Sequence, residues 1–480
     1  MKKSVSLFLA LTISLISISC FEDYDDNPSF SDLEVKDFVW KALNAIYLYK
    51  PDMPDLANDR FSSSEEYTQY LNSYDSPESL FENLKYQPEV VDRFSRIFPD
   101  YFALEQLLSG TSLSNGMEFS YYIKPNTNNE VFCVIKLILP NSSASNNGLI
   151  RGMMFDTVNG SQLYYNSATD NNFDLLSSNS YTISLVLYNT NGTSETNDDS
   201  IIPLDQTINL TKTAYDENPI YKTEILNVNG GEKLGYLMYN GFFDEYNNQL
   251  NEVFSDFQSN GVQHLVLDLR YNGGGSIQTA TYLGSMVTGQ FNGQIFAKLQ
   301  YSENLVNNNT DYHFSNSIDG GGSINSLNLD KVYVITTGST ASASELVINS
   351  LKEYITVIQV GTTTVGKSQA SRIVYDSPQL FNRNNVNPNH TYAMLPLIGI
   401  TVNVNDGQVP TNGIVPDAAY ELNESIVSLD VLGSPNEPLL AKVIEDIENS
   451  NRMASQPEKE GIYPVQVKFP EKLTDFILYE

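Results

Sequence analysis

The stretch KVYVITTGSTASASELVINSLKEYITVIQVGTTTVGKSQAS, residues 331–371, decides the fold predicted for this chain. Its opening run, KVYVITT, is apolar and β-branched, which predicts a buried strand. Apolar residues from Leu346 to Leu351 have the spacing of a helix packed on one face. A second strand is predicted in ITVIQVG, 355–361. A strand that leads through small residues into a helix can expose a serine hydroxyl beside backbone N–H groups that bind an oxyanion.

The serines and threonines of this turn also have an ordinary structural interpretation. Ser339, Thr340, Ser342 and Ser344 could cap the helix, because their side-chain oxygens accept bonds from the first helical amides. Lys367, in TTTVGKSQAS, could be a plain surface lysine. The catalytic interpretation pairs a serine with this lysine. A serine hydroxyl becomes a good nucleophile when a base takes its proton, and lysine serves as that base when desolvation lowers its pKa to about 7–8.

The same segments resemble the S41 family of serine peptidases, the C-terminal processing peptidases and their relatives. That family carries S-A-S-E at a helix start and G-K after the next strand, and here these are residues 342–345 and 366–367. Lys367 follows Ser342 by 25 positions, the separation that the family uses between nucleophile and base. The resemblance therefore implies a Ser–Lys dyad, with Ser342 as nucleophile and Lys367 as base.

A glycine-rich segment, HLVLDLRYNGGGS at 264–276, resembles the family's D-L-R-x-N-x-G-G. Glycines allow backbone to approach a substrate carbonyl without a Cβ in the way. By resemblance, the amides of Gly274 and Ala343 form the oxyanion hole. Asp268 and Arg270 are predicted to form an internal ion pair or loop brace and not to act in catalysis.

The identity of the third catalytic residue stays open. The family places a glutamine four residues beyond the lysine, where it orients the amine, but here that position is Ser371 and the glutamine is Gln369. In an extended segment Lys367, Gln369 and Ser371 share one face, so either residue could contact the lysine. A histidine-based triad is disfavoured, because the three histidines lie in a strand-like run or in polar, Asn-rich segments.

The N-terminal sequence predicts export. MKKSVSLFLALTISLISISC has two lysines followed by an apolar run too short for a stable membrane span. Cys20 at its end resembles the lipidation site of a bacterial lipoprotein of the Bacteroidetes type, with Ser17 where leucine is usual. Residues 1–19 are predicted as a lipoprotein signal peptide and 20–30 as an acidic tether. The alternative is a signal cut elsewhere, with an incidental cysteine. An exported lipoprotein is expected at the outer membrane, on its periplasmic or cell-surface face.

The composition of the chain limits the classes of partner that it can bind. The formal net charge of −31 argues against nucleic acid and against an anionic membrane surface, since both favour basic patches. The chain has two cysteines, Cys20 and Cys133, so acylation of Cys20 would leave no intrachain disulfide. Cys133 is predicted to be a small buried core residue. We expect neither a cofactor nor a metal.

Three domains are predicted after the tether. Residues 31–103 show helical periodicity, with aromatic residues around Trp40 that we assign to core packing. Residues 104–205 read as strands and turns. Residues 206–480 are predicted as the catalytic domain, with a helix in PLLAKVIEDIEN (438–449) and a last strand in YPVQVKF (463–469).

The β-rich region resembles a PDZ domain. The matching pieces are Leu139-Pro140, residues 147–149 and Val158-Asn159-Gly160. Such domains bind an extended peptide by strand addition. The alternative is a β-rich spacer with an Asn-Gly turn.

The resemblance implies an α/β catalytic domain of the ClpP/crotonase-like type behind a PDZ-like and a helical domain. It implies a serine endopeptidase that forms an acyl-enzyme on Ser342 and cleaves exported polypeptides, recognised through C-terminal or unfolded segments. Two alternatives remain. One is a catalytically weak or inactive peptide-binding lipoprotein on the same fold, which the displaced glutamine favours. The other is an acyl-CoA-handling protein, although we find no basic residues to hold a CoA phosphate.

Overall fold

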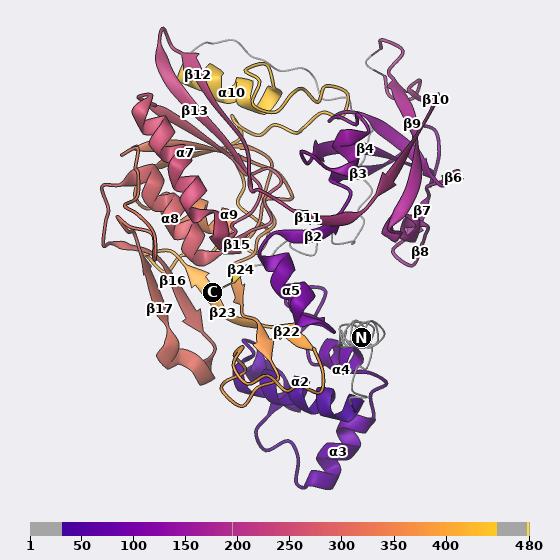
Figure 1. The fold of residues 1–480 in the computed structure, drawn as a ribbon, viewed down its shortest axis with the longest axis vertical. Helices are drawn as coiled ribbons and strands as arrows, with labels where there is room; N and C mark the ends of the chain where they lie inside the picture. The colour runs from indigo at the N-terminus through magenta and orange to yellow at the C-terminus, as the bar shows by residue number, and fades with distance from the viewer. Residues whose placement is uncertain (1–30, 194, 449–477, 480) are drawn as a thin grey trace, which may run out of the picture.

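The computed structural model describes residues 31–193, 195–448 and 478–479. Figure 1 shows an N-terminal part (31–110) at the bottom, a β-rich part (111–216) at the upper right and a larger α/β part (217–448 and 478–479). The predicted signal peptide, the lipidation site Cys20, the acidic tether and the strand at 463–469 lie outside the described residues. Within those residues, no helix combines the length and apolar character needed to cross a membrane.

The N-terminal part is helical, as predicted. Its helices are α2 (Asp32–Ile46), α3 (Ser64–Asn72), α4 (Pro77–Asn83) and α5 (Tyr101–Leu108), with short 3₁₀ turns η1 (Lys50–Asp52) and η2 (Pro54–Leu56). Helix α4 begins where Ser76 caps it, because the Ser76 hydroxyl accepts the N–H of Ser79 at 3.1 Å and proline fills the first helical position. The predicted boundary at 103 falls inside α5.

The helical periodicity predicted over residues 31–103 is wrong at residues 96–98. There the chain forms strand β1 (Arg96–Phe98), which pairs antiparallel with β22 (Ala393–Leu395) of the α/β part. Three residues paired with a distant strand override a local apolar spacing that also suits a helix. The N-terminal part is therefore joined to the α/β part by main-chain bonds.

The β-rich part holds one sheet with the strand order β10-β9-β5-β4-β3, to which β6 adds beside β5. The strands are β3 (Met117–Ile123), β4 (Val131–Ile138), β5 (Met154–Val158), β6 (Ser161–Gln162), β9 (Ser180–Asn189) and β10 (Ser200–Thr211). Smaller elements are α6 (Ser143–Asn146), η3 (Phe173–Ser177), β7 (Tyr165–Ser167) and β8 (Asp170–Asn171). Cys133 is fully buried in the core, which confirms its predicted role.

The predicted boundary at 205 falls inside β10. This strand pairs with β9 as far as Thr211, so the segment expected to lead into the catalytic domain completes the β-rich sheet. The chain enters and leaves the β-rich part through β2 (Thr111–Ser114) and β11 (Thr213–Asp216), which pair antiparallel as a two-stranded ribbon. Figure 1 shows this ribbon between the β-rich part and the α/β part.

The α/β part is built on a five-stranded sheet with the order β12-β13-β14-β18-β19. The strands are β12 (Ile220–Val228), β13 (Glu232–Tyr239), β14 (His264–Asp268), β18 (Lys331–Thr336) and β19 (Thr356–Gly361). From β13 onward they run parallel. The helices are α7 (Asn247–Ser259), α8 (Ile277–Thr288), α9 (Ala343–Leu351) and α10 (Pro438–Ile447), with 3₁₀ turns η4 (Asp244–Tyr246) and η5 (Glu303–Asn308). These elements confirm the strand–helix–strand order predicted for 331–361.

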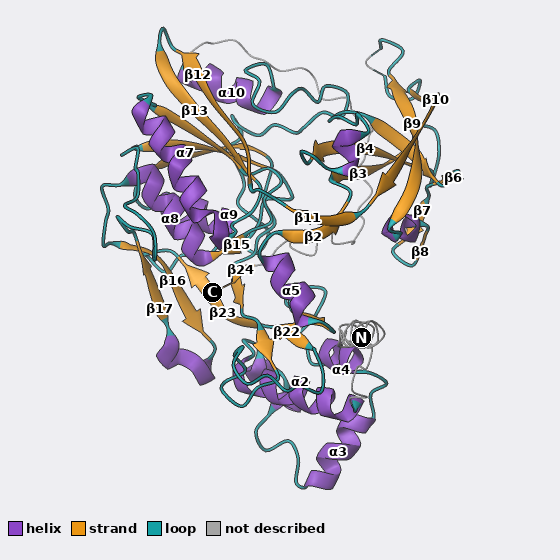
Figure 2. Cartoon of the chain, in the orientation of Figure 1, coloured by secondary structure: helices purple, strands orange, loops and turns teal. Residues whose placement is uncertain are grey.

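Both faces of this sheet are covered. Along β18, Val332 and Val334 pack into the core shared with α7, α8 and α9, whereas Tyr333 and Ile335 join the cluster that contains α10. This alternation follows from the period of two in a strand. Figure 2 shows α7 and α8 together beside the sheet, with α10 set apart from them near β12 and β13.

A second sheet, in the order β15-β24-β20-β23-β16-β17, lies in the same part. Its strands are β15 (Gly275–Ser276), β16 (Ile295–Tyr301), β17 (Thr310–His313), β20 (Gln369–Ser371), β23 (Leu397–Val402) and β24 (Leu478–Tyr479). A further strand, β21 (Val374–Tyr375), pairs with β22. One hydrophobic core contains Phe38 and Leu43 of α2 together with Leu397 and Ile398 of β23, so the N-terminal and α/β parts share their interior.

Candidate active site

Ser342 lies at the turn between β18 and α9, immediately before the helix begins. Its backbone has φ 63° and ψ −113°, a conformation that costs a residue with a Cβ on the order of 1–3 kcal/mol. The side chain is fully buried, and its Oγ has no hydrogen-bond partner among the residues that the structure describes. The turn therefore holds the hydroxyl in a strained position without a bond that would compete with a base.

Lys367 is buried, with 1% of its surface exposed. Burial lowers its pKa to about 7, and the positive charge of Arg96 acts in the same direction, while Asp92 and Glu345 oppose the shift. Its Nζ lies 4.9 Å from the centre of the Phe94 ring. Near neutral pH a large share of this lysine is therefore uncharged, the state that a general base requires.

The carboxylate of Glu345 connects the serine and lysine segments. One oxygen accepts the backbone N–H of Ser342 at 2.8 Å and that of Lys367 at 2.9 Å. The other accepts the N–H of Gly366 at 2.7 Å and the hydroxyl of Thr364. Burial raises the pKa of Glu345, and these hydrogen bonds act against that rise. A single buried side chain thus fixes both backbones relative to each other.

The glycine-rich segment and the serine turn are bonded to each other. The backbone oxygen of Asn272 accepts the N–H of Ala341 and the hydroxyl of Ser344, both at 3.1 Å. Ala343 is the first residue of α9, so its N–H has no acceptor within the helix. The N–H of Gly274, however, donates to Oδ1 of Asn272 at 2.9 Å. The structure therefore differs from expectation at Gly274, whose amide reaches an oxyanion only after this bond opens.

Gln369 and Ser371 are both buried on β20, two positions apart as expected for one face. The Nε2 of Gln369 donates to the hydroxyl of Tyr49 at 3.2 Å. Ser371 lies opposite Tyr479 in the ladder between β20 and β24. The identity of the third catalytic member therefore stays a prediction.

Residues 92–96 of the N-terminal part lie close to the lysine, and the sequence analysis predicted no role for them. The side chain of Asp92 accepts the N–H of Ser95 at 2.8 Å and the hydroxyl of Tyr47, which orders this loop. The Nη2 of Arg93 reaches the carbonyl oxygen of Gly366 at 3.5 Å. The one sequence pattern that could have indicated this role is an aromatic residue, Phe94, between Arg93 and Arg96.

The three histidines have partners elsewhere. His264 lies 2.9 Å from Glu232, His390 lies 3.0 Å from Asp376, and His313 lies 3.1 Å from the backbone oxygen of Asp311. These contacts agree with the prediction that no histidine acts as the base.

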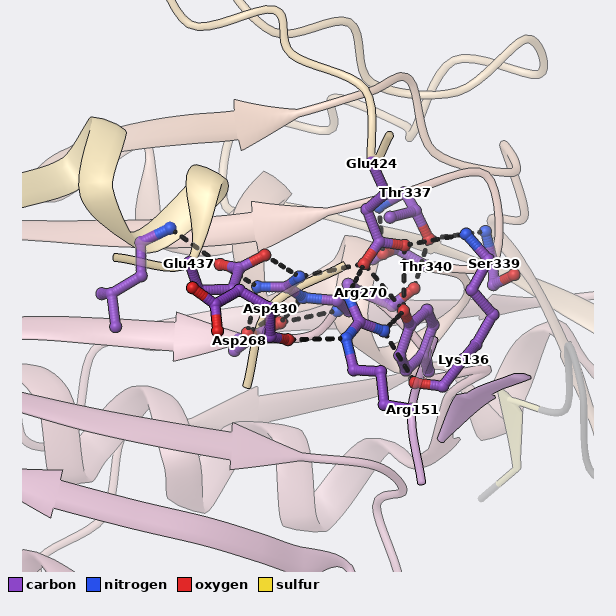
Figure 3. Close-up of polar contacts among 12 residues, drawn as sticks. Lys136, Arg151, Asp268, Arg270, Thr337, Ser339, Thr340, Glu424, Asp430 and Glu437 are labelled. Carbon is purple, nitrogen blue, oxygen red and sulfur yellow. Dashed lines mark hydrogen bonds and ion pairs between the residues drawn. The ribbon is translucent and has the colours of Figure 1, made fainter. Parts of the chain in front are cut away.

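Arg270 is fully buried within a cluster of carboxylates, shown in Figure 3. Its guanidinium lies 2.7 Å from Asp268, 3.0 Å from Glu424 and 2.7 Å from Glu437. The predicted Asp268–Arg270 ion pair is thus confirmed. The hydroxyl of Thr337 also donates to the carbonyl oxygen of Arg270, and this connects the cluster to the loop before Ser342.

The β-rich part contributes two cations to the Arg270 cluster. Arg151 lies 2.6 Å from Glu424 and Lys136 lies 3.7 Å from it. Burial alone would raise the pKa of Glu424, but Lys136, Arg270 and Arg151 together hold that pKa well below its usual range. Arg151 also donates to the hydroxyl of Tyr271 at 2.6 Å, the residue after Arg270. The cluster therefore joins the β-rich part to the glycine-rich segment.

A cavity of about 330 Å³ lies in the β-rich part, between β3 and η3. Phe119 and Tyr121 of β3 line one side and Phe173 of η3 lines the other. Tyr271 and Ser339 of the α/β part also line it. The cavity therefore extends from the edge strand of the β-rich sheet to the loop that carries the serine.

Two family models match the chain: Peptidase family S41 over residues 233–382 and the Peptidase S41 N-terminal domain over residues 34–96. The carboxyl-terminal-processing protease of Picosynechococcus sp. is 26% identical over 162 residues, which are 34% of this chain and 35% of that protein. The chloroplastic C-terminal processing peptidase of Tetradesmus obliquus is 25% identical over 177 residues, 35% of each chain. The chain thus matches about a third of the length of these curated relatives.

A crystal structure from Bacteroides fragilis, of a protein assigned to the S41 proteases, superimposes with a TM-score of 0.66 at 26% identity. The match covers 86% of this chain and 97% of that one. The S41 family model spans Gly274, Ser342 and Lys367, and the N-terminal model reaches Arg96. The chain is therefore similar to the S41 peptidases over the segments that hold Gly274, Ser342 and Lys367, and to the S41 N-terminal domain over residues 34–96.

Proposed function

We propose that this protein is a serine endopeptidase that cleaves polypeptides through an acyl-enzyme on Ser342, with Lys367 as general base. The observation that carries the proposal is the setting of Lys367. This lysine is buried with a pKa lowered to about 7, and the carboxylate that holds its backbone also holds the backbone of Ser342. The similarity to peptidase family S41 supports the same reaction class.

In the proposed reaction, neutral Lys367 takes the proton of the Ser342 hydroxyl as Oγ attacks the scissile carbonyl. The oxyanion that forms accepts a hydrogen bond from the N–H of Ala343. It accepts a second one from the N–H of Gly274 once the bond between this N–H and Asn272 has opened. The protonated lysine then gives its proton to the departing amine. Water, deprotonated by the same lysine, hydrolyses the ester on Ser342. Gln369 or Ser371 is proposed to orient the amine.

Substrate recognition is proposed to involve the β-rich part acting as a PDZ-like module. Strand β3 forms the edge of its sheet, and the cavity of about 330 Å³ lies beside it. An extended peptide can add to such an edge through main-chain bonds while its side chains enter the cavity. The contacts of Arg151 with Glu424 and Tyr271 connect this module to the glycine-rich segment.

The substrates are proposed to be exported polypeptides. The support is the apolar N-terminal run followed by Cys20, which suits a lipid-anchored protein outside the cytoplasm. The acidic composition supports a partner other than nucleic acid.

The test is cleavage of fluorescein-labelled casein by the chain lacking residues 1–20, beside Ser342→Ala and Lys367→Ala. Each variant should lose at least about 10³-fold in kcat/KM, since dyad members act as a unit. The matched control is Lys352→Ala, because Lys352 is exposed at the end of α9. Labelling by a fluorophosphonate should require Ser342. Retained cleavage in both dyad variants would reject the mechanism.

A peptide-binding protein without turnover is the second candidate. The bond between Gly274 and Asn272 and the complete burial of Ser342 favour it. Peptide binding without labelling of Ser342, and without cleavage after PDZ-binding peptides are added, would decide for this candidate.

A further inference from the structure

We propose that strand β24, residues 478–479, occupies the place in which a polypeptide substrate is held, so that the chain carries its own competitor for the active site. The inference rests on the proposed function and adds a regulatory element to it.

Strand β24 lies between β15 and β20 in the second sheet and runs parallel to both. Leu478 pairs with Gly275, and Tyr479 pairs with Ser276 on one side and Ser371 on the other. Figure 1 shows β24 next to β15 at the C-terminal end of the chain. No other described strand lies between β15 and β20.

The two neighbours of β24 are continuous with the catalytic segments. β15 begins directly after Gly274, and β20 begins two residues after Lys367. Neighbouring strands lie about 4.8 Å apart, so β15 and β20 border a slot of about 10 Å that one extended chain fills. A strand in this slot lies between the segment with the predicted oxyanion donor and the segment with the base.

The β15 wall of the slot presents main-chain groups. On its other side, β15 is already bonded to Phe242, since the N–H of Phe242 donates to Gly274 and the N–H of Ser276 donates to Phe242, both at 2.9 Å. The polar groups of Gly275 therefore face β24. Gly275 has φ +134°, and a Cβ there would lie 2.4 Å from the oxygen of Phe242. A wall of this kind binds an extended backbone with little regard to its sequence.

The shortness of β24 suits an occupant that can be displaced. A strand of two residues forms few ladder bonds, and one of its side chains, Tyr479, supplies a further contact. The Tyr479 hydroxyl donates to the carbonyl oxygen of Leu108 at 3.4 Å. Tyr479 also borders a cavity of about 390 Å³ that Arg372 and Glu245 help to line. Displacement of β24 would open this cavity to a substrate side chain.

The environment of Ser342 and Gly274 is compatible with occupation of the slot by β24. In the structure that holds β24, Ser342 is fully buried, and the N–H of Gly274 donates to Asn272 within its own segment.

The experiment measures binding of fluorescein-labelled casein by fluorescence anisotropy in a Ser342→Ala background, where no turnover is needed. Removal of residues 478–480 should lower the apparent Kd by about tenfold, as expected if β24 fills nine sites in ten. Leu478→Pro in the full chain should act in the same direction, because proline removes a main-chain donor from the strand. The free peptide TDFILYE, residues 474–480, should compete with casein for the shortened chain, whereas a scrambled peptide should not.

A purely structural β24 gives a different result. Both variants would then lose thermal stability and bind casein no more tightly, and TDFILYE would not compete; this outcome overturns the proposal. The two proposals fail separately. If the protein does not hydrolyse peptides, casein binding still improves on removal of β24, whereas if β24 is only structural, the Ser342-dependent cleavage of the full chain is unaffected.

Discussion

The side-chain nitrogen of Lys367 lies 4.9 Å from the centre of the Phe94 ring, across the contact between the N-terminal part and the α/β part. An aromatic face attracts a cation, which would favour the charged lysine. The same ring excludes water, which favours the neutral form. Burial is the largest cause of the fall in the pKa of Lys367 to about 7, and Phe94 forms part of its surroundings.

Phe94→Ala should therefore make the enzyme less active at neutral pH. Water reaching Lys367 would raise its pKa, so that a smaller fraction of the lysine is neutral at pH 7. The acid limb of kcat/KM, expected near pH 7 in the parent, should move to higher pH. The control is Phe94→Leu, which keeps the site apolar. An acid limb at the same pH in all three proteins would show that Phe94 does not set the lysine pKa.

Arg96→Gln should shift the same limb upward for an electrostatic reason. The positive charge of Arg96 lowers the pKa of Lys367, so its removal raises that pKa. Activity should fall below pH 7 and recover at high pH, where the lysine is neutral in both proteins. Arg60→Gln is a matched control in the N-terminal part, because Arg60 pairs with Asp55 instead. A uniform loss at every pH would indicate a structural role for Arg96.

Glu345→Gln should reduce kcat with little change in KM. An amide group in place of one carboxylate oxygen turns a donor toward the donors of the Ser342 and Lys367 segments. The unpaired groups should lower the free energy of unfolding by about 1–3 kcal/mol. A misplaced dyad should lose about 10² in rate. The exposed Glu353→Gln serves as control, and kcat equal to that of the parent would contradict the assigned role.

Arg270→Met should lower the free energy of unfolding at pH 7 by about 3–5 kcal/mol, because it leaves buried carboxylates without their partner. The effect should shrink in acid. Glu424 has a pKa held below its usual 4.5, so its ion pairs stabilise the parent above that range and are lost as pH falls. Urea unfolding at pH 7 and pH 4 measures this difference. The exposed Arg383→Met is the control, and an equal loss at both pH values would argue against carboxylate repulsion.

The local parts of the site could be predicted from the sequence. The turn at Ser342 and the segment of Lys367 follow from apolar runs and small residues that lie close together in the chain. The role of Phe94 could not be predicted this way, since Arg93, beside it, is 273 positions from Gly366. Contacts across such separations leave no periodic signal.

Other differences have similar physical causes. The β-rich part extends beyond the boundary expected at 205, because β10 pairs with β9. Strand propensity does not say which sheet a strand joins. Strand β24 has only two described residues, too few for a pattern of alternation. At Gly274 the motif suggested a free amide, but Asn272, within the same motif, accepts its N–H.

The common core of α2 and β23 has a consequence for how the molecule unfolds. Phe38 and Ile398 belong to one hydrophobic cluster, so the N-terminal helices cannot melt without exposing the interior of the α/β part. The sheet around Cys133 and Phe155 has a cluster of its own. Leu137 and Leu139 of the β-rich part, however, pack in the cluster that contains α10. The N-terminal helices and the catalytic serine therefore belong to one cooperative unit, and calorimetry should show them melting in the same transition.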